Sequence, residues 1–444
     1  MKIMFVKPNV GAGRSADALE PAVFALLAGL TPPDVDLDLY DDRIESIPAD
    51  ATADLVAMTV DTFSAGRAYR LAADFRRRGL PVIMGGFHPT LCPDEVARHA
   101  DAVAIGDAED VWPQVVSDLR AGRLQTRYES GYGALSGLCP DRSIFKGKAY
   151  GPVAIVEHGR GCRYSCDFCS IHAVYGAVHR QRPVSEVLAE VAGLKRKLIV
   201  FADDNLLCDV RRARDLFAGL RSLRVRWAGQ ISLDIVRRPE LMDLMAASGC
   251  ISVTIGFESL ATENLAQMGK SWNSRLGSYA EAVAVLRRRG IMVYGTFVCG
   301  YDHDTPATVQ AALDFAVGSR LFLANFNPLM PLPGTPLLAR LRASGRLLQD
   351  PWWLHPDYRW GDVVFRPACM SARQLAEACR EARRRFNSLG CIARRALDLR
   401  ANFGSPLRAM TYLMCNRATR RELARKQGQR LGWRDLRPAA EATS

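Results

Sequence analysis

The sequence predicts an α/β protein with three parts: an N-terminal Rossmann-like domain, a partial (β/α)6 barrel of the TIM type and a helical C-terminal region. Strand-like and helix-like segments alternate twice along the chain, which predicts parallel sheets joined by helical crossovers. A weakly periodic stretch separates the two series, and repeated prolines from Pro328 onward end the second. We therefore expect domains at 1–125 and 153–330, a linker at 126–152 and a C-terminal region at 331–444.

The first series consists of short apolar runs and amphipathic segments. Apolar runs bounded by turn residues are typical of buried parallel strands. The segment 65–78 has helical spacing and ends at Gly79, a residue that commonly follows a helix. Right-handed crossovers between such strands give a doubly wound sheet. The expected strands are 3–6, 35–40, 55–59, 81–84 and 102–105, and the expected helices are 21–30, 65–78, 93–99 and 111–119.

The second series repeats a strand–helix unit six times, which predicts a partial barrel. In barrels of this kind the functional groups collect at the carboxyl ends of the strands. The residues that follow each strand are therefore the candidates for chemistry. The expected strands are 154–157, 198–201, 226–231, 252–255, 293–298 and 322–327, with helices at 184–194, 211–220, 239–247, 278–289 and 305–317.

The C-terminal region is aromatic and then basic. The stretch 352–365 is rich in Trp, Tyr and Phe and either lines a pocket for a flat or apolar substrate or packs the tail onto the barrel. Helices are expected at 372–389 and 392–400. From Ser371 onward the chain has 17 basic and 6 acidic residues, so most of its net charge of +12 lies there. A basic tail suits an anionic partner such as nucleic acid or lipid, but it also suits a solvated helical face.

The overall composition is that of a globular protein. Hydrophobic residues make up 48% of the 444 positions, and no apolar run is long enough to span a membrane as a helix. The N-terminus lacks the apolar core of a signal peptide. These features predict a cytoplasmic location, with or without peripheral contact of the basic helices to a membrane. Disulfides are not expected in that location. Nine of the 12 cysteines are scattered along the chain, and most of these nine are expected to be small buried side chains.

Three cysteines form the one cluster in the sequence. Cys162, Cys166 and Cys169 have the spacing C-x3-C-x2-C directly after the first barrel strand. Three thiolates on one loop can bind three irons of a [4Fe–4S] cluster and leave the fourth iron open for a ligand, whereas a ferredoxin site needs a fourth cysteine. Gly159 and Gly161 allow the loop to turn tightly. The alternative is a zinc site, but zinc ligands usually come as two separated C-x2-C pairs.

At this loop the sequence resembles the radical S-adenosylmethionine (SAM) superfamily, in which an aromatic residue, here Phe168, precedes the third cysteine. The resemblance extends over about residues 153–327. It implies that the open iron binds the amino and carboxylate groups of SAM. One electron, from an external donor, then cleaves SAM to methionine and a 5′-deoxyadenosyl radical, which abstracts hydrogen from an unactivated carbon.

The same resemblance suggests roles for residues at the later strand ends. Asp203 and Asp204 are expected to meet the SAM ammonium or a polar group of the substrate, although they also suit a turn or a helix cap. Gln230 ends the third strand. Glu258 is similar to the acidic residue that the family places near the methionine or ribose of SAM, and Gly300 to its adenine-contacting turn.

The N-terminal turns resemble the cobalamin-binding domain of B12-dependent radical SAM proteins over about residues 1–125. The resemblance rests on Gly-Gly-Phe-His-Pro-Thr at 85–90 and on Ile-Gly-Asp-Ala-Glu at 105–109. The Asp-x-His-x-x-Gly motif that supplies a cobalt ligand in other B12 proteins is absent, so no cobalt ligand is assigned. His88 either faces the corrin edge or is a structural residue beside a turn. The candidate cobalamin-facing residues are Thr59, Thr62, Gly85, Gly86, His88, Gly106 and Glu109.

The family implies a cobalamin-dependent methyltransferase acting on an unactivated carbon of a small-molecule or lipid-like substrate. A B12-dependent oxidoreductase or cyclase that transfers no methyl group is the alternative. A methylthiotransferase acting on RNA is disfavoured, because the first 138 residues contain only Cys92 and such enzymes carry a second three-cysteine cluster there. A nucleic-acid partner is therefore not expected. A zinc-bound interaction protein is the non-enzymatic alternative.

Overall fold

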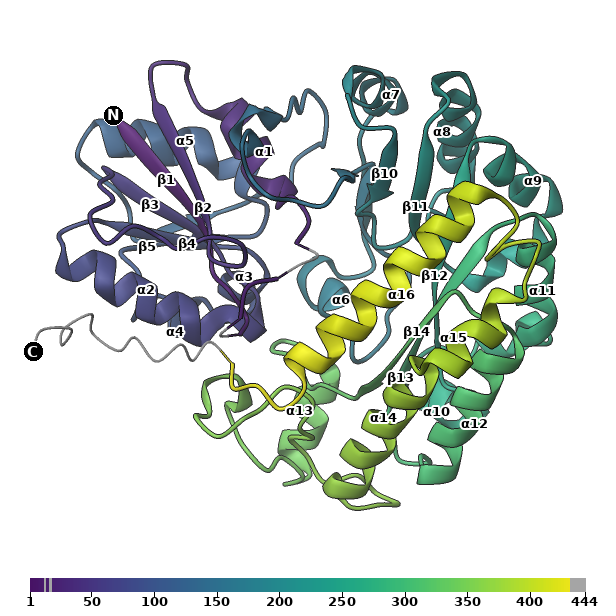
Figure 1. The fold of residues 1–444 in the computed structure, drawn as a ribbon. Coiled ribbons are helices and arrows are strands. Elements are labelled where there is room, and N and C mark those ends of the chain that lie inside the picture. Colours follow the sequence, from purple (N-terminus) through teal and green to yellow (C-terminus); the bar gives the residue numbers. More distant parts are fainter. Residues whose placement is uncertain (12, 16–17, 432–444) are drawn as a thin grey trace, which may run out of the picture.

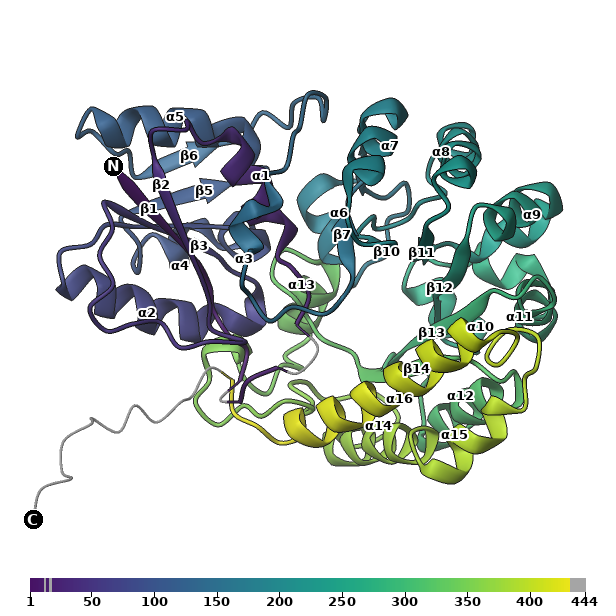
Figure 2. The same cartoon turned by 45° about the horizontal axis from the view of Figure 1, so that its top comes forward.

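The computed structural model describes residues 1–431 except residue 12 and residues 16–17. It contains two six-stranded parallel sheets and a two-stranded hairpin. Figure 1 shows the N-terminal sheet on one side, the barrel on the other and the last helices across the outside of the barrel. In the turned view of Figure 2 the two sheets are again seen as separate units. Helix α6 (Ser170–Tyr175) lies at the side of the barrel that faces the N-terminal domain. Residues 432–444 of the expected C-terminal region lie outside the described residues.

The N-terminal sheet is doubly wound. Its strand order is β2-β1-β3-β4-β5-β6, with every described pair parallel. This order reverses direction between β1 and β3, the point at which open α/β sheets bind ligands. The strands are β1 Lys2–Lys7, β2 Asp36–Asp41, β3 Leu55–Thr59, β4 Val82–Gly85, β5 Ala102–Ile105 and β6 Arg127–Glu129.

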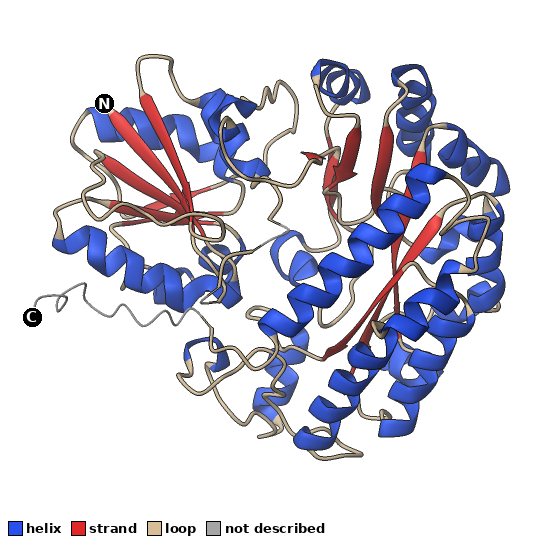
Figure 3. Ribbon diagram, viewed as in Figure 1, coloured by secondary structure: helices blue, strands red, loops and turns tan. Residues whose placement is uncertain are grey.

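Helices cover both faces of this sheet (Figure 3). One face packs on α1 (Ala22–Leu30) and α5 (Ala108–Arg120), and the other on α2 (Ala65–Arg77) and α4 (Pro93–Val96). Two short elements, the 3-10 turn η1 (Thr62–Ser64) and helix α3 (Phe87–Leu91), follow the carboxyl ends of β3 and β4. They bring polar and aromatic side chains to the edge of the sheet nearest the barrel.

The second sheet is an open barrel with strand order β14-β13-β12-β11-β10-β7, also parallel throughout. Its strands have apolar side chains on the outer face, against which the helices pack. The strands are β7 Ala154–Val156, β10 Leu198–Phe201, β11 Arg226–Ile231, β12 Cys250–Glu258, β13 Met292–Cys299 and β14 Leu323–Pro328. The helices are α7 Val184–Gly193, α8 Val210–Leu223, α9 Pro239–Ala247, α10 Thr262–Gln267, α11 Tyr279–Arg288 and α12 Pro306–Gly318.

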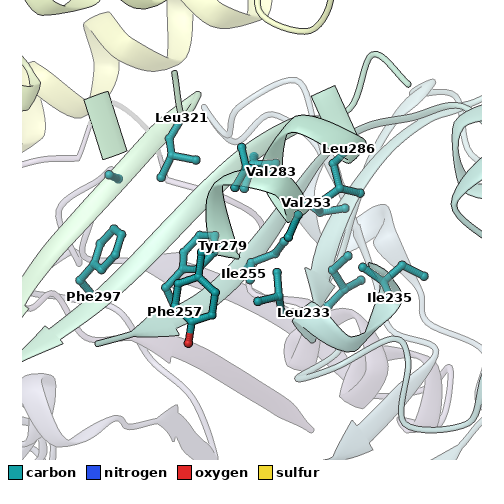
Figure 4. Packing of buried hydrophobic residues seen from close by; sticks show 14 of the residues in the cluster. Leu233, Ile235, Val253, Ile255, Phe257, Tyr279, Val283, Leu286, Phe297 and Leu321 are labelled. Carbon is teal, nitrogen blue, oxygen red and sulfur yellow. The ribbon is translucent and has the colours of Figure 1, made fainter. Parts of the chain in front are cut away.

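The barrel core holds its strands in position through close aromatic and aliphatic packing. Figure 4 shows Phe257 of β12 and Phe297 of β13 beside Tyr279 of α11, with Val253, Ile255 and Leu286 in the same layer. The rings of Phe257 and Phe297 stack with centroids 5.7 Å apart. Burial of such side chains stabilises the strand ends by roughly 1.5–3 kcal/mol per residue, which fixes the positions of the groups beyond them.

The C-terminal region closes the open edge of the barrel. Helix α14 (Ala372–Phe386) packs on β14 and α12, and α15 (Leu389–Ala396) and α16 (Pro406–Lys426) continue around the outside. Arg395 is fully buried there and donates to the carbonyl oxygens of Leu321, Phe322 and Phe386. The preceding segment contains α13 (Pro336–Ala343) and the turn η5 (Trp352–Leu354), which packs against the N-terminal domain.

The strands and helices expected from the sequence form, with ends shifted by a few residues. The stretch expected as a linker is packed rather than free: β6 joins the N-terminal sheet, and the 3-10 turn η2 (Arg142–Phe145) packs beside α1. The domain limits at residues 125, 152 and 330 therefore stay a prediction. Among the described residues no helix is long and apolar enough to cross a membrane.

Candidate functional site

The three clustered cysteines lie on the loop between β7 and α6, as the spacing predicts. The loop starts with strand β8 (Gly159–Gly161), which pairs with β9 (His179–Gln181) as an antiparallel hairpin. Gly161 has φ +84°, and a Cβ there would lie 2.1 Å from the carbonyl oxygen of Val178. The loop ends at Cys169, whose carbonyl accepts from Ala173 in the first turn of α6. The hairpin and the helix thus hold both ends of the loop.

The surroundings of the thiols suit a metal cluster. Burial raises the pKa of Cys166 to about 12, so this thiol ionises at neutral pH only when a cation binds it. A hydrogen bond from Cys208 lowers the pKa of Cys162 to about 6. Burial also raises the pKa of Cys169. Sulfur ligands on one tight loop are what an iron–sulfur cluster takes, so these residues fit a cluster with three protein ligands.

A buried ion pair lies beside the cysteines at the end of β12. Lys270 Nζ is 2.9 Å from Glu258 Oε1 and donates to the Gly256 carbonyl at 2.7 Å. Burial opposes the charge of Lys270, but Glu258 and Cys166 outweigh it and raise the pKa of the ammonium. Glu258 has φ +63° and follows an irregularity in the pairing of β12 with β13. The predicted acidic residue is thus near the cluster loop, with a lysine partner that sequence reasoning missed.

Asp203 and Asp204, after β10, both hold the cysteine loop. Asp203 is buried and accepts from the His158 backbone N–H at 2.9 Å. Asp204 accepts from the Gly161 backbone N–H at 2.9 Å. Burial raises the pKa of Asp204 to about 7. Neither residue caps the next helix, since Asp209 does so, and Asp204 also faces a cavity described below.

Gln230 and Gly300 occupy different environments. The Gln230 side chain is exposed at the end of β11, and its carbonyl accepts from the Leu206 N–H at 3.0 Å. Gly300 follows β13 with φ +123° and is buried. A Cβ on Gly300 would lie 2.7 Å from Leu375 Cδ2 and 2.9 Å from the Phe365 ring. At Gly300, the Cα hydrogen in the position of a side chain therefore points toward Leu375 and Phe365 of the C-terminal region.

A cavity of about 340 Å³ lies between the two sheets, and we call it the interdomain cavity. On the N-terminal side it is lined at the ends of four neighbouring strands, β1, β3, β4 and β5. On the barrel side it is lined by the cysteine-loop hairpin and α6. Small side chains at the strand ends leave room for a flat group, so this surface fits a planar cofactor. Of the candidate residues, those that line the cavity are Thr59, Gly86, Gly106, Glu109 and Asp204.

The other N-terminal candidates lie away from the lining. Thr62 is buried in η1, and Gly85 ends β4. His88 is fully buried, and its Nε2 is 3.0 Å from both the Tyr69 hydroxyl and Glu95 Oε1. The structure therefore places His88 in a hydrogen-bonded group inside the domain, which corresponds to the structural alternative for this histidine.

Arg160, which sequence reasoning missed, joins the two domains at this cavity. Its guanidinium contacts Glu109 and Asp107 of the N-terminal domain and Glu157 of the barrel. Burial raises the pKa of Glu109, and the nearby Arg160 opposes that shift. Arginine after Gly159 carries no recognisable pattern, so only the fold shows that Glu109 is held by an arginine.

Phe168 lines a second cavity of about 400 Å³, which we call the apolar cavity. It lies at the carboxyl ends of β13 and β14 and is closed by the aromatic C-terminal segment. Of that segment, Tyr358 and Trp360 line the cavity, whereas Trp352 and Trp353 are buried against the N-terminal domain. The substrate-pocket interpretation therefore stays a prediction for Tyr358 and Trp360. Trp352 and Trp353 pack against the N-terminal domain, whereas the alternative named the barrel.

Comparison with known proteins supports the chemistry that the cysteine loop suggests. The model of the radical SAM superfamily matches residues 156–316. Bacteriochlorophyllide d C-12(1)-methyltransferase of Chlorobaculum tepidum is 30% identical over 90% of this chain and 89% of its own length. This chain belongs to the B12-dependent radical SAM family. It is an enzyme of a family whose cofactors are a [4Fe–4S] cluster, SAM and cobalamin.

Two further comparisons bear on the family and the fold. The hopanoid C-2 methylase of Rhodopseudomonas palustris is 27% identical over 78% of this chain and 68% of its own length. The solved structure of the radical SAM methyltransferase TsrM from Kitasatospora setae, with cobalamin and a [4Fe–4S] cluster bound, superposes with a TM-score of 0.63. It is 17% identical and covers 86% of this chain and 81% of that chain. At this identity the likeness shows the fold alone.

Proposed function

We propose that this enzyme transfers a methyl group to an unactivated carbon of a small-molecule or lipid-like substrate. When bound, the cluster and SAM supply a 5′-deoxyadenosyl radical that removes hydrogen, and methylcobalamin supplies the methyl group. The observation that carries the proposal is the interdomain cavity, where Gly106 and Thr59 of the N-terminal sheet face Asp204 beside the cysteine loop. One chamber thus adjoins both predicted cofactor sites.

The residues of this chain have separate tasks in that scheme. Cys162, Cys166 and Cys169 hold the cluster, and Asp203 and Asp204 fix the loop that carries them. In this scheme Gln230 and Glu258 bind polar groups of SAM, with Lys270 balancing the carboxylate.

On the N-terminal side we assign cobalamin to the surface formed by Thr59, Gly86 and Gly106. No residue is assigned as a cobalt ligand.

The relatives indicate the kind of substrate. The two methyltransferases above act, by their names, on bacteriochlorophyllide d and on a hopanoid. A cyclase relative, the anaerobic magnesium-protoporphyrin IX monomethyl ester cyclase of Rubrivivax gelatinosus, is 23% identical over 87% of this chain. Methyl transfer is the better supported activity because the methyltransferases are more similar over a comparable length.

The test uses SAM with a deuterated methyl group. The anaerobically prepared full chain, with its cluster reconstituted and cobalamin added, is incubated with that SAM and a reductant. We expect 5′-deoxyadenosine and cobalamin carrying the labelled methyl group, both read by mass spectrometry. Formation of 5′-deoxyadenosine without any labelled cobalamin would favour the oxidoreductase or cyclase alternative, and tightly bound zinc without iron would contradict the radical mechanism.

We also propose that the outer face of α15 and α16 contacts an anionic membrane. Apolar side chains there are each more than half exposed, among them Leu397, Leu399 and Met414. Exposed arginines, including Arg400 and Arg417, flank them. Apolar side chains beside basic ones are typical of helices that lie in a membrane surface.

Sedimentation with vesicles of phosphatidylglycerol and phosphatidylcholine tests this contact. We expect binding that weakens when Leu399 and Met414 are both changed to Asp. Binding that is equal for both proteins, or that is absent from wild type, would contradict the contact. The electron donor remains an external protein or small reductant in this proposal.

A further inference from the structure

The apolar cavity has the size and position of a substrate site. Its volume of about 400 Å³ lies within the range of small-molecule sites. Phe168, between Cys166 and Cys169, forms part of one wall, and Phe63 of the N-terminal domain forms part of another. A molecule bound there would lie close to the cluster loop and to the turn that follows β3. The sequence predicts a functional role for Phe168 and, as one of two alternatives, a substrate pocket at the aromatic stretch 352–365, which contributes Tyr358 and Trp360 here.

One charged group lines this otherwise apolar and amide-bearing cavity. Arg383 of α14 is 4% exposed, and its guanidinium lies 5.0 Å from the centre of the Trp360 ring. Its one side-chain hydrogen bond within the described residues is from Nη2 to Gln427 Oε1, at 3.3 Å. No carboxylate of the described residues lies within 4 Å of it. Burial lowers the pKa of this guanidinium, as expected where no anion offsets the cost of desolvation.

A second buried arginine in the same region shows that this arrangement is not required for packing. Arg395 also lacks a carboxylate, but it donates to three backbone carbonyls and to Asn416 Oδ1. Both of its terminal nitrogens are therefore met by neutral acceptors inside the protein, while its buried Nε has no partner among the described residues. Among the described residues Arg383 has no comparable set of acceptors, and it faces a cavity instead. The two arginines differ in that Arg383 retains donors for a ligand.

We propose that the apolar cavity binds the substrate and that Arg383 binds an acidic group on it, with a carboxylate as the best match. The guanidinium offers two parallel N–H donors, which fit a carboxylate and form charge-assisted hydrogen bonds. Tyr358, Trp360, Phe63 and Phe168 then contact the apolar body of the substrate. This inference rests on the proposed function and narrows its substrate class to apolar or polycyclic carboxylic acids. A neutral lipid would leave Arg383 unpaired.

The test measures binding alone and so does not depend on methyl transfer. Pyrenebutyrate and pyrenebutanol are matched fluorescent probes, with the same flat body and with or without a carboxylate. They are titrated into the full chain with its cluster reconstituted and without SAM. Wild type is expected to bind pyrenebutyrate about tenfold or more tightly than pyrenebutanol, because a hydrogen bond to a charged group contributes that much. Equal affinities in wild type would overturn the inference without any variant.

Variants locate the preference. In Arg383→Gln the two probes should bind equally, and in Arg383→Lys an intermediate preference should remain. Arg384→Gln is the matched control, because Arg384 is the next residue of α14 but is exposed and pairs with Glu381. An unchanged preference in Arg383→Gln, or a loss of preference in Arg384→Gln, would contradict the assignment. If labelled cobalamin forms as proposed while the probe preference is absent, the substrate inference fails and the methyltransferase function stands.

Discussion

Cys208 lies close to Cys162 and lowers its pKa, although it is well outside the three-cysteine loop. Four cysteine ligands would close the cluster and remove the open iron that SAM needs. The position of Cys208 therefore bears directly on the chemistry. Its spacing carried no signal in the sequence, because Cys208 reaches the loop only through the turn after β10.

We predict that Cys208→Ser keeps about four irons per chain, the content of a [4Fe–4S] cluster, whereas Cys166→Ser loses them. The reason is that the loop supplies the three ligands and a serine hydroxyl can replace the hydrogen bond that Cys208 makes to Cys162. Iron and sulfide analysis after anaerobic reconstitution checks this. Loss of iron in Cys208→Ser to the level of Cys166→Ser would make Cys208 a fourth ligand and contradict SAM binding at an open iron.

The Lys270–Glu258 pair is the second residue-scale feature with energetic weight. Both side chains are about one-tenth exposed, so each charge depends on the other. Breaking a buried pair by removing one partner leaves an uncompensated charge, which costs roughly 3–5 kcal/mol.

We predict that Lys270→Met lowers the free energy of unfolding by roughly 3 kcal/mol. The double variant Lys270→Met with Glu258→Gln should recover a large part of that loss, because no buried charge remains. Chemical denaturation of the apo protein measures the cycle. Equal losses in the single and double variants would show that the pair contributes through packing alone.

At the scale of elements, segments with a clear apolar pattern could be predicted and segments without one could not, whatever their length. The apolar runs at 55–59 and 198–201 match β3, which is buried on both faces, and β10, whose residues alternate between partly buried and buried. The β8–β9 hairpin has three residues in each strand, one of them Gly159–Gly161, which has no apolar pattern. Strand β6 was likewise missed, since only Tyr128 of its three residues is buried. Such elements exist through tertiary contacts, which no local pattern records.

The candidate site divides in the same way. The cysteines and the strand-end acids could be predicted because spacing and strand position are local properties. The partners of those acids could not: Lys270 pairs with Glu258, and Arg160 with Glu109, across turns or domains. The apolar cavity, with Arg383 on its wall, is formed by three separate parts of the chain.

The hairpin is nevertheless decisive for the cluster loop, and Gly161 tests it. We predict that Gly161→Ala loses most of the iron, because a Cβ would lie 2.1 Å from the Val178 carbonyl and φ is +84°. Gly176→Ala is the control in the same segment, since Gly176 also has positive φ but nothing within 4 Å. That change should cost about 1 kcal/mol of stability and keep the iron. Equal iron contents in the two variants would show that the loop tolerates a shifted hairpin.

At the scale of the whole molecule, the carboxyl ends of β3, β4 and β5 face the barrel across one cavity. In both the doubly wound sheet and the barrel, functional groups gather at the carboxyl ends of the parallel strands, and this arrangement follows from that shared property. The domains are held together at the cavity by charges, in that Arg160 contacts Asp107 and Glu109, and Arg180 contacts Asp107. Tyr175 of α6 adds a hydrogen bond to Asp107 at 2.9 Å.

We predict that Arg160→Met weakens both the assembly of the domains and the retention of cobalamin. Glu109 would lose its arginine, whereas Asp107 would keep Arg180, and the free energy of unfolding should fall by roughly 3 kcal/mol. Arg163→Met is the matched control, because Arg163 is on the same loop but pairs with Asp234 within the barrel and is partly exposed. Thermal unfolding and the cobalamin retained after gel filtration are the measurements.

Because the cysteine loop is held at Gly161 by Asp204 rather than by Arg160, the iron content of Arg160→Met should stay near that of wild type. Loss of both iron and cobalamin in Arg160→Met would mean that the hairpin itself depends on Arg160. Loss of neither would mean that the apolar contacts of η5 with the N-terminal domain are sufficient to hold the two sheets face to face.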